Sequence, residues 1–419
     1  MSGANLPLQG MSDIVSPEVS VWQRLETTAR EILARYAFTE IRTPILEKLE
    51  VFTHSLGDTT DIVQKEMYAF TDRGGRNITL RPEGTAGVMR WVAGAGQESA
   101  DARLYYIGPM FRAERPQAGR KRQFHQLGVE AIGPANALQD AEVIEMQHRL
   151  LSAWGVKDAV FQLNTRGAPE EMENVRAGLR DALRPRLAEL CPDCQRRFEQ
   201  NVLRILDCKV PSCRAIAQAA PRMIDLMAPA SRDYFQAVLD ALARLGVPAV
   251  HNPMLVRGLD YYQHTVWEVT SASLGAQDAL SGGGRYRVNA GGREIDGVGF
   301  GVGLERVITA LGLTEAETAA LVPRPVAYLA AHNADAIVPN QALARDLRAA
   351  GISCIVSFEP RSLKSQFKSA DRARVRFTLV RGEAELAAGT CQIKEMATGT
   401  QEAVPLDGVA AWIRGRTSE

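Results

Sequence analysis

The sequence has few cysteines, few aromatic residues and no excess of either charge. Its 419 residues include only 6 cysteines and 6% aromatic side chains, and 49 basic residues balance 49 acidic ones. Because six cysteines over this length do not form a dense disulfide framework, we expect reduced thiols. The formal net charge of zero means that any contact with a polyanion must come from local basic patches.

Long apolar runs are also absent. No stretch approaches the roughly 18 to 20 apolar residues of a membrane-spanning helix, and the opening MSGANLPLQGMSD lacks the basic and apolar parts of a signal peptide. We therefore expect a cytoplasmic protein without a membrane partner. With 46% apolar residues, the chain can bury two or three cores at roughly 100 to 200 residues per domain.

The spacing of apolar residues predicts an α+β catalytic domain. A long helix follows Ser16, and the next segments, ITLRPEG, RLYYIG, MFRAE and QFHQLGVEAIG, alternate like strands at short intervals. This order favours a central antiparallel sheet flanked by helices. Residues 168–244 are charged and helical in character, which predicts a helical insertion into this domain.

A second domain is predicted after a linker marked by Pro323 and Pro325. Strand-like and helical segments alternate beyond these prolines, as in a small α/β domain. We therefore predict a first domain over residues 1–323, interrupted at 168–244, and a C-terminal α/β domain over residues 326–419.

The segment FRAERPQAGRKRQFHQLGVEAIG, residues 111–133, predicts two strands around a basic loop. Its alternation places Phe124, Gln126 and Glu130 on one face, and His125 with apolar residues on the other. Arg112 and Glu114 share one side of the first strand by the same period. An aromatic ring, a guanidinium and a glycine gap suit a flat ligand that carries phosphate.

Three further segments offer polar groups for a ligand. LRPEGTAG contains Glu83 and Thr85, which suit an ammonium group, although a helix cap with a solvated glutamate explains them equally well. GFGVGLER places glycines before a helix with Arg306 in its first turn, which suits phosphate but is also a common packing device. VRGLDYYQHT sets Arg257 near two tyrosines, which alone would be ordinary sheet packing.

Taken together, these segments resemble class II aminoacyl-tRNA synthetases, and specifically the histidyl-tRNA synthetase family, over nearly the whole chain. TEIRTPILE is similar to the family's first motif, at its dimer interface, and the hairpin and GVGFGVGLER are similar to its second and third motifs. RGLDYY and GGGRY resemble the two histidine-specific segments. The resemblance implies a homodimeric histidine–tRNA ligase that uses L-histidine, tRNA(His) and ATP with Mg²⁺.

The resemblance also implies a role for individual residues. Arg112 would bind the histidine carboxylate and the α-phosphate, and Arg257 would be the catalytic arginine at that phosphate. The full ATP set is Arg112, Glu114, Arg120, Phe124 and Arg306. The full histidine set is Glu83, Thr85, Arg112, Gln126, Glu130, Arg257, Tyr261 and Tyr262, of which Glu83, Thr85 and Gln126 would bind the α-amino group and Glu130 and Tyr262 the imidazole.

Two basic stretches are expected to contact tRNA. In the hairpin loop, the resemblance implies contacts from Arg115, Gln117 and Arg122 to the acceptor end. The stretch RSLKSQFKSADRARVR contains Lys364 and Lys368 and resembles a helix of the family's anticodon-binding domain. Without that context, a basic run of this kind is more often a solvated face.

Two other functions remain open from the sequence. One is a non-catalytic paralogue that regulates the first enzyme of histidine biosynthesis, but such paralogues typically lose the C-terminal domain, RGLDYY and the ATP arginines. The other is a nucleic-acid-binding protein without catalysis, which would not need Glu83, Gln126 and Glu130 together with an ATP-binding hairpin. The chain retains all of these features, so we predict an enzyme.

Two details depart from familiar patterns. Tyr286 is followed by Arg287, Val288 and Asn289, where the family usually has Asp-Gly-Leu, so the conformation of this loop is open. Four cysteines form CPDC and, after thirteen residues, CKVPSC, which is near a zinc-ribbon spacing but does not match it. We predict no bound metal, and leave structural zinc as the alternative.

Overall fold

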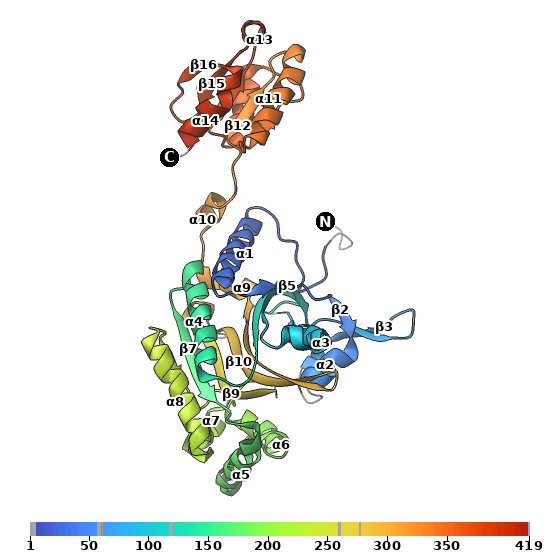
Figure 1. Ribbon diagram of the computed structural model, residues 1–419, viewed down its shortest axis with the longest axis vertical. Coiled ribbons are helices and arrows are strands. Elements are labelled where there is room, and N and C mark those ends of the chain that lie inside the picture. The colour runs from blue at the N-terminus through green and yellow to red at the C-terminus, as the bar shows by residue number, and fades with distance from the viewer. Residues whose placement is uncertain are drawn as a thin grey trace. The chain divides into compact units, whose positions relative to one another are not determined.

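The fold comes from a computed structural model that describes residues 6–56, 60, 62–116, 120–258, 261–275 and 278–417. The chain divides into two compact units, Met1–Ala319 and Ala320–Glu419, the second of which is orange and red in Figure 1. No helix among the described residues is long and apolar enough to cross a membrane.

The first unit is built on an eight-stranded sheet with the order β1-β5-β6-β11-β10-β9-β7-β8. The six central strands pair antiparallel, as predicted, whereas β1 and β8 pair parallel at the two edges. The strands are β1 (Thr39–Glu40), β5 (Arg103–Phe111), β6 (Gln123–Ile132), β7 (Ala159–Thr165), β8 (Ala249–His251), β9 (Tyr262–Ser271), β10 (Ala279–Ala290) and β11 (Arg293–Gly303).

Two sequence expectations about these strands were wrong in detail. RLYYIG and the first two residues of MFRAE form one strand, β5, which continues through Pro109 because this residue still pairs with His125 of β6. The predicted strand residues Arg112 and Glu114 lie beyond the end of β5. The residues after Tyr286 do not form a loop. They extend β10 against β11, where the Arg287 guanidinium pairs with the Asp296 carboxylate at 2.8 Å.

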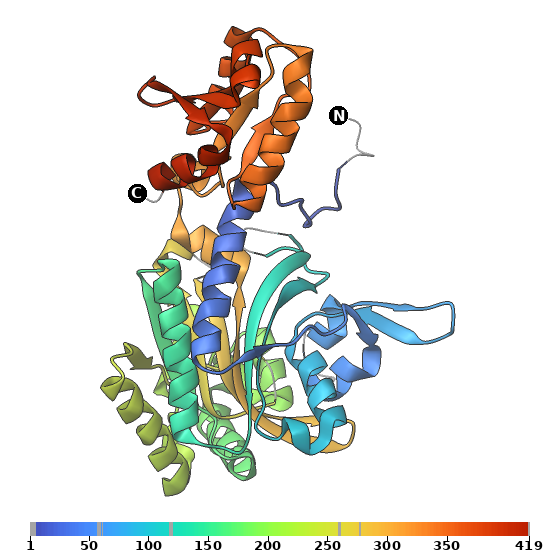
Figure 2. The same ribbon diagram turned by 45° about the horizontal axis from the view of Figure 1, so that its top comes forward.

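Helices α1 (Glu18–Arg35) and α4 (Ala137–Trp154) lie side by side on one face of the sheet (Figure 2). The Trp154 indole N–H donates to the Leu25 carbonyl and joins the two helices. On the sheet, Trp267 and Ser281 point toward α4, because their side chains bond to Gln147. Residues at alternate positions, including Gly282 and Tyr286, therefore point to the opposite face.

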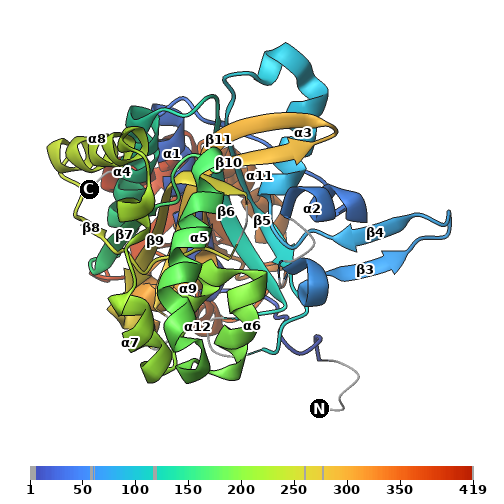
Figure 3. The same ribbon diagram turned by 90° about the horizontal axis from the view of Figure 1, so that it is seen from below.

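A smaller sheet and two helices flank this opposite face. The three-stranded sheet has the order β2-β4-β3, and β3 and β4 project as a hairpin from the body of the unit in Figure 3. The elements of this flank are β2 (Leu46–Lys48), α2 (Leu49–Leu56), η2 (Ile62–Glu66), β3 (Tyr68–Thr71), β4 (Asn77–Leu80), α3 (Thr85–Ala95) and η3 (Gly96–Ser99). Elsewhere lie η8 (Ala272–Leu274), α9 (Leu304–Leu311), which contacts α1, and α10 (Glu315–Ala320).

The stretch predicted as a helical insertion is helical from Pro169 to Arg244 and has its own apolar core, which includes Leu179 and Phe198. This stretch is called the helical module below. It follows β7 and leads back to the sheet through β8. Its elements are η4 (Pro169–Glu171), α5 (Met172–Leu183), η5 (Arg184–Glu189), α6 (Pro192–Gln200), η6 (Val202–Ile205), α7 (Pro211–Ala219), η7 (Met223–Leu226) and α8 (Pro229–Arg244).

The second unit is an α/β fold around a five-stranded sheet with the order β13-β12-β14-β15-β16. The first three strands in that order are parallel and the last two are antiparallel. Its elements are β12 (Ala327–Ala330), η9 (Ala334–Ala336), α11 (Ile337–Ala349), β13 (Cys354–Val356), α12 (Leu363–Arg372), β14 (Phe377–Val380), α13 (Glu383–Ala388), β15 (Thr390–Glu395), β16 (Gln401–Pro405), η10 (Leu406–Gly408) and α14 (Val409–Thr417).

Candidate active site

Two adjoining pockets open on the sheet face opposite α4. The inner pocket has a volume of about 90 Å³ and the outer pocket about 260 Å³. Their common wall consists of Arg112, Gln126, Arg257, Gly282 and Gly301. Groups bound in the two pockets would therefore meet beside two arginines.

The structure gathers the two predicted sets of residues into these two pockets. The inner pocket is lined by the whole histidine set, Glu83, Thr85, Arg112, Gln126, Glu130, Arg257, Tyr261 and Tyr262. The outer pocket is lined by the whole ATP set, Arg112, Glu114, Arg120, Phe124 and Arg306. The alternation of β6 puts Phe124, Gln126 and Glu130 on one face, and strand pairing brings the others to them. Their individual roles remain predictions.

Glu130 lies at the base of the inner pocket with only 2% of its surface exposed. Its carboxylate accepts hydrogen bonds from the Thr85 hydroxyl and the Tyr286 hydroxyl, each at 2.7 Å. Burial nevertheless raises the pKa of Glu130 to about 8, because these two bonds only partly compensate for the lost water. A ligand that brings positive charge or N–H donors would complete its solvation.

Glu83 combines the two roles that its sequence left open. Both carboxylate oxygens accept backbone N–H groups in the first turn of α3, from Thr85 and Ala86 at 2.7 Å. It is a helix cap, but the side chain is buried and not solvated. Burial raises the pKa of Glu83 against the effect of these bonds, so a second carboxyl of the inner pocket also favours a cationic ligand.

Four tyrosines form an aromatic wall around these carboxyl groups. Tyr261 contacts Tyr262 edge to face at 4.8 Å between ring centroids, and Tyr286 at 5.9 Å. The Tyr106 ring fills the space above Gly84 and Gly128, where an added Cβ would lie 2.2 Å and 2.1 Å from it. Burial raises the pKa of these tyrosines, so their hydroxyl groups stay protonated as donors.

Arg257 lies at the junction of the two pockets. Its guanidinium donates to the Glu268 carboxylate at 2.6 Å and lies over Gly282, where a Cβ would be 2.3 Å from the guanidinium carbon. Burial opposes its charge, but Tyr262 and Glu268 outweigh this effect and raise the pKa of Arg257. A glycine at 282 is therefore a condition for the arginine to lie flat against the strand.

Two buried atoms of the common wall have no hydrogen-bond partner among the described residues. They are the side-chain oxygen of Gln126 and the Nε of Arg257. An unpaired buried polar atom costs roughly 1 to 3 kcal/mol. An ammonium group at Gln126 and an anionic oxygen at Arg257 would each remove this cost.

The outer pocket combines an aromatic ring with several cations. The Arg112 guanidinium lies over the Phe124 ring, 5.1 Å from its centroid, and its Nε donates to the Pro82 carbonyl at 3.0 Å. Glu114 pairs with Arg120 at 3.0 Å. Arg306, in the first turn of α9, donates to the Ala279 carbonyl, and burial lowers its pKa. The ring and the cations suit a nucleotide base and its phosphates.

The basic residues expected to contact tRNA lie at several places. Arg115 is exposed, whereas Arg122 donates to the carbonyls of Glu114 and Gln9, both at 3.3 Å. Gln117 lies outside the described residues. Lys364 and Lys368 are exposed one helical turn apart on α12, in the second unit.

Sequence reasoning missed three residues that shape the site. Tyr286 and Tyr106 line the inner pocket, and Glu268 holds the catalytic-arginine candidate. The alternation of β10 carried a signal for Tyr286, because it is two and four residues from Gly284 and Gly282 on the same face. Glu268 carried no such signal, since its meeting with Arg257 depends on how the chain returns to the sheet.

This arrangement can hold a small cationic molecule and a phosphorylated one with their reactive ends together. The inner pocket has two carboxyl groups and hydroxyl donors, and the outer pocket has an aromatic ring and arginines. The two arginines at the junction would stabilise negative charge that develops between the ligands.

Comparisons with known proteins agree with this geometry. Residues 10–307 match the family model for histidyl-tRNA synthetase, and residues 327–416 match an anticodon-binding domain. The chain is 46% identical to a histidine–tRNA ligase of Bacillus cytotoxicus, over 97% of both chains. It is 44% identical to one of Moorella thermoacetica, again over 97% of both.

Solved structures give the same result. Apo histidyl-tRNA synthetase of S. aureus superposes with a TM-score of 0.81 at 32% identity, over 98% of this chain and 99% of that one. An ATP phosphoribosyltransferase regulatory subunit/histidyl-tRNA synthetase from Bacillus halodurans C has a TM-score of 0.66 at 21% identity, over 87% of this chain and 96% of that one, which shows a common fold alone. The matching family models, the relatives and the fold together show that the chain belongs to the histidyl-tRNA synthetase family.

Proposed function

We propose that the chain is a histidine–tRNA ligase, which activates L-histidine with ATP and transfers it to tRNA(His). The observation that carries this proposal is the pair of pockets with Arg112 and Arg257 in their common wall. Histidine in the inner pocket and ATP in the outer pocket would meet with the histidine carboxylate next to the α-phosphate.

In the inner pocket, Glu83, Thr85 and Gln126 would bind the α-ammonium group. The buried carboxyl of Glu83 and the unpaired oxygen of Gln126 support this assignment. Glu130 and Tyr262, with Tyr261 nearby, would bind the imidazole. A pocket that hydrogen-bonds a polar ring can reject apolar amino acids by about 10⁴- to 10⁵-fold, so no editing site is needed.

In the outer pocket, Phe124 would stack on adenine and Glu114 would accept its amino hydrogens. Arg120 and Arg306 would bind the outer phosphates. Mg²⁺ would enter as part of the ATP substrate, as such ions usually bind phosphates together with one or two carboxylates. Among the described residues, the carboxylates that line this pocket are Glu114 and Glu305, and Glu305 is the one without a proposed contact to adenine.

Adenylation would need no protein nucleophile. An oxygen of the histidine carboxylate attacks the α-phosphorus, and the bond to the β-phosphate oxygen breaks to release pyrophosphate. Arg112 and Arg257 would stabilise the charge on the α-phosphate in the transition state. The terminal ribose hydroxyl of tRNA(His) then attacks the histidyl carbonyl carbon, and AMP leaves.

Transfer to tRNA would use both units. Arg115, Gln117 and Arg122 would contact the acceptor end, and the unit that matches an anticodon-binding domain would contact the anticodon through Lys364 and Lys368. A homodimer through residues 39–47 is supported by the exposed apolar side chains of Ile45 and Leu46, 43% and 47% exposed. A cytoplasmic location stays a prediction of the sequence.

The decisive experiment is ATP–pyrophosphate exchange with each of the twenty amino acids. We expect exchange with histidine alone. Absence of exchange with histidine, in protein that is folded and binds ATP, would refute the proposal and favour a regulatory paralogue. Aminoacylation of tRNA(His) by the same preparation then tests the transfer step.

A further inference from the structure

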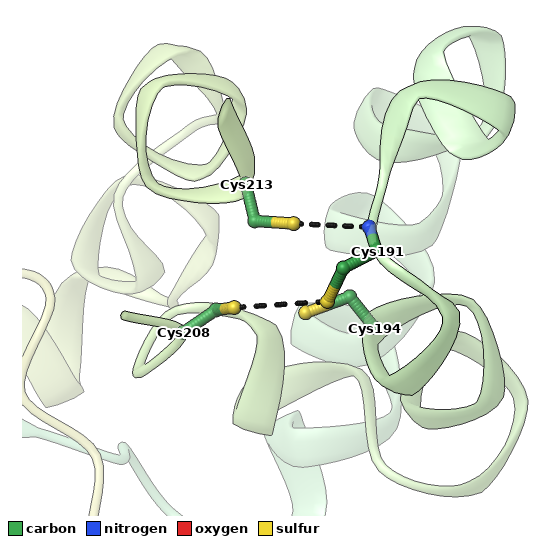
Figure 4. A group of neighbouring side chains, drawn as sticks. All are labelled: Cys191, Cys194, Cys208 and Cys213. Carbon is green, nitrogen blue, oxygen red and sulfur yellow. Dashed lines mark hydrogen bonds between the residues drawn. The ribbon is translucent and has the colours of Figure 1, made fainter. Parts of the chain in front are cut away.

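Four cysteines of the helical module converge on one point. Cys191, Cys194, Cys208 and Cys213 are separated by up to 22 residues along the chain, yet their sulfur atoms all lie within 4.8 Å of one another. Figure 4 shows the four side chains turned inward toward a common centre. The other two cysteines, Cys354 and Cys391, are in the second unit.

The separation of the sulfur atoms fits a tetrahedral zinc ion. A Zn–S bond of about 2.3 Å places the sulfur atoms of a tetrathiolate site about 3.8 Å apart. The Cys191 and Cys208 sulfur atoms are 4.0 Å apart, and the largest separation exceeds the ideal edge by only about 1 Å. Small rotations of the side chains would therefore close the site around an ion.

Two short helices present the sulfur atoms in the same way. α6 and α7 each begin with proline, Pro192 and Pro211, and each carries a cysteine two residues later, Cys194 and Cys213. Four thiolates and Zn²⁺ leave a net charge of −2, and the positive ends of two helix dipoles offset part of it. The backbone N–H of Cys191 also donates to the Cys213 sulfur at 3.1 Å, which suits a thiolate acceptor.

The spacing that spoke against zinc in the sequence has a structural reason. Cys208 lies in the turn after η6, and the four residues between it and Cys213 contain the rest of this turn and the start of α7 at Pro211. This interval still lies within the range of about two to four intervening residues found in structural zinc sites. A site made from helix starts does not need the strict zinc-ribbon spacing.

We propose that Cys191, Cys194, Cys208 and Cys213 bind one structural zinc ion that fastens the helical module. The ion would join the start of α6, the turn after η6 and the start of α7. Cys194, Cys208 and Cys213 already lie in the module's apolar core, so the metal would complete that core. This site is independent of the two pockets and of the aminoacylation chemistry.

The zinc would also position a basic surface. α6 carries Arg196 and Arg197, which line a cleft of about 880 Å³ together with Arg176, Arg180, Arg204 and Lys65. Because Cys191 and Cys194 hold the first turn of α6, metal binding would fix the helix that presents two of these arginines.

The test is the metal content of the full chain, purified without chelator and without added metal. Elemental analysis by inductively coupled plasma mass spectrometry should find about one zinc ion per chain. Cys208→Ser and Cys213→Ser should each lose the zinc, whereas the matched control Cys354→Ser should keep it. Replacement by Co²⁺ should give the strong visible absorption of tetrahedral thiolate coordination, and zinc removal should lower the thermal unfolding temperature.

Several results would overturn the proposal. One is the finding that the unmodified protein is purified without zinc and, when zinc is added, binds no more of it than the Cys208→Ser variant does. Another is a disulfide between any two of the four cysteines in that protein, detected by mass spectrometry without reduction. If a variant fails to fold, the metal content and cobalt spectrum of the unmodified protein still decide the question.

Discussion

At the scale of single residues, the site contains buried polar groups whose burial costs free energy, and its substrates would reduce this cost. Glu83 and Glu130 are buried carboxyl groups with raised pKa values, and Gln126 and Arg257 each have an unpaired buried atom among the described residues. Each of these groups matches a charge on histidine or ATP. The cost in the free protein is therefore relieved when both substrates bind, which favours their binding.

Arg257→Ala should lower the rate of adenylation by roughly 10²- to 10³-fold, the scale of losing one preorganised electrostatic donor. The reason is that Arg257 would stabilise the α-phosphate in the transition state. Rapid-quench measurement of histidyl-adenylate formation checks this directly. The matched control is Arg287→Ala, an arginine of β10 that lies outside both pockets, and a near-normal rate in Arg257→Ala would contradict the assignment.

Glu130→Gln should flatten the pH dependence of stability. The pKa of this carboxyl rises from 4.5 in the unfolded chain to about 8 in the folded one. The folded state is therefore disfavoured at a pH where the unfolded chain has already ionised this group. The unfolding free energy should therefore fall as pH rises between these values, by up to about 4 to 5 kcal/mol at 1.36 kcal/mol per pKa unit. Urea unfolding at pH 5 and pH 9 measures this fall.

The amide of Glu130→Gln does not titrate, so the fall should shrink by that amount in the variant. Carboxyl groups that do not interact with Glu130 contribute equally to both proteins and cancel in the comparison. Glu83 is not one of them, because its charge helps to raise the pKa of Glu130. Identical changes with pH in the two proteins would show that Glu130 is not protonated near neutrality.

At the scale of elements, glycines in the central strands make room for the polar side chains of the site. Gly299 and Gly301 of β11 lie under Glu130 and Gln126, where a Cβ would be 2.3 Å and 2.1 Å from their polar atoms. Gly282 does the same for Arg257. Strand pairing thus sets the depth of the pockets, and glycine supplies the necessary close approach.

Gly282→Ala should reduce adenylation by at least tenfold while the protein stays folded. The added methyl group would displace the Arg257 guanidinium from the strand, and small displacements of positioning groups cost rate steeply. Gly94→Ala is the control, since its Cβ meets open space in α3 and should stabilise the helix by up to about 1 kcal/mol. Pyrophosphate exchange and thermal unfolding on both variants distinguish a local effect from a folding defect.

At the scale of the whole molecule, we expect adenylation to need the first unit alone and tRNA binding to use both units. Both pockets are built from residues of the first unit. The second unit carries the match to an anticodon-binding domain and the exposed lysines of α12. Variants of the second unit should therefore change transfer to tRNA without changing adenylation.

The double variant Lys364→Ala with Lys368→Ala should weaken tRNA(His) binding and lower its salt dependence. Each lost phosphate contact should reduce the slope of log affinity against log salt by about one. Filter binding at several salt concentrations measures this slope, and histidine-dependent pyrophosphate exchange should stay normal. Arg345→Ala, an exposed arginine of α11 in the same unit, is the control, and an unchanged slope in the double variant would exclude the lysines from the interface.

The sequence alone determined what depends on local pattern. Alternation in residues 123–132 predicted which side chains of β6 share a face, and helical spacing predicted α1 and the helical module. The motifs also predicted the family, because their chemistry is carried by short contiguous segments. Interaction over a few residues is enough to set each of these features.

Only the tertiary structure decided which distant segments meet. Arg112 and Arg257 are separated by 145 residues, and their place in one wall depends on the pairing of β6, β11, β10 and β9. The same holds for Glu268 beside Arg257, and for four cysteines whose spacing alone argued against a metal site. Strand order and helix packing set these distances, because burial of apolar faces brings together segments that no local pattern connects.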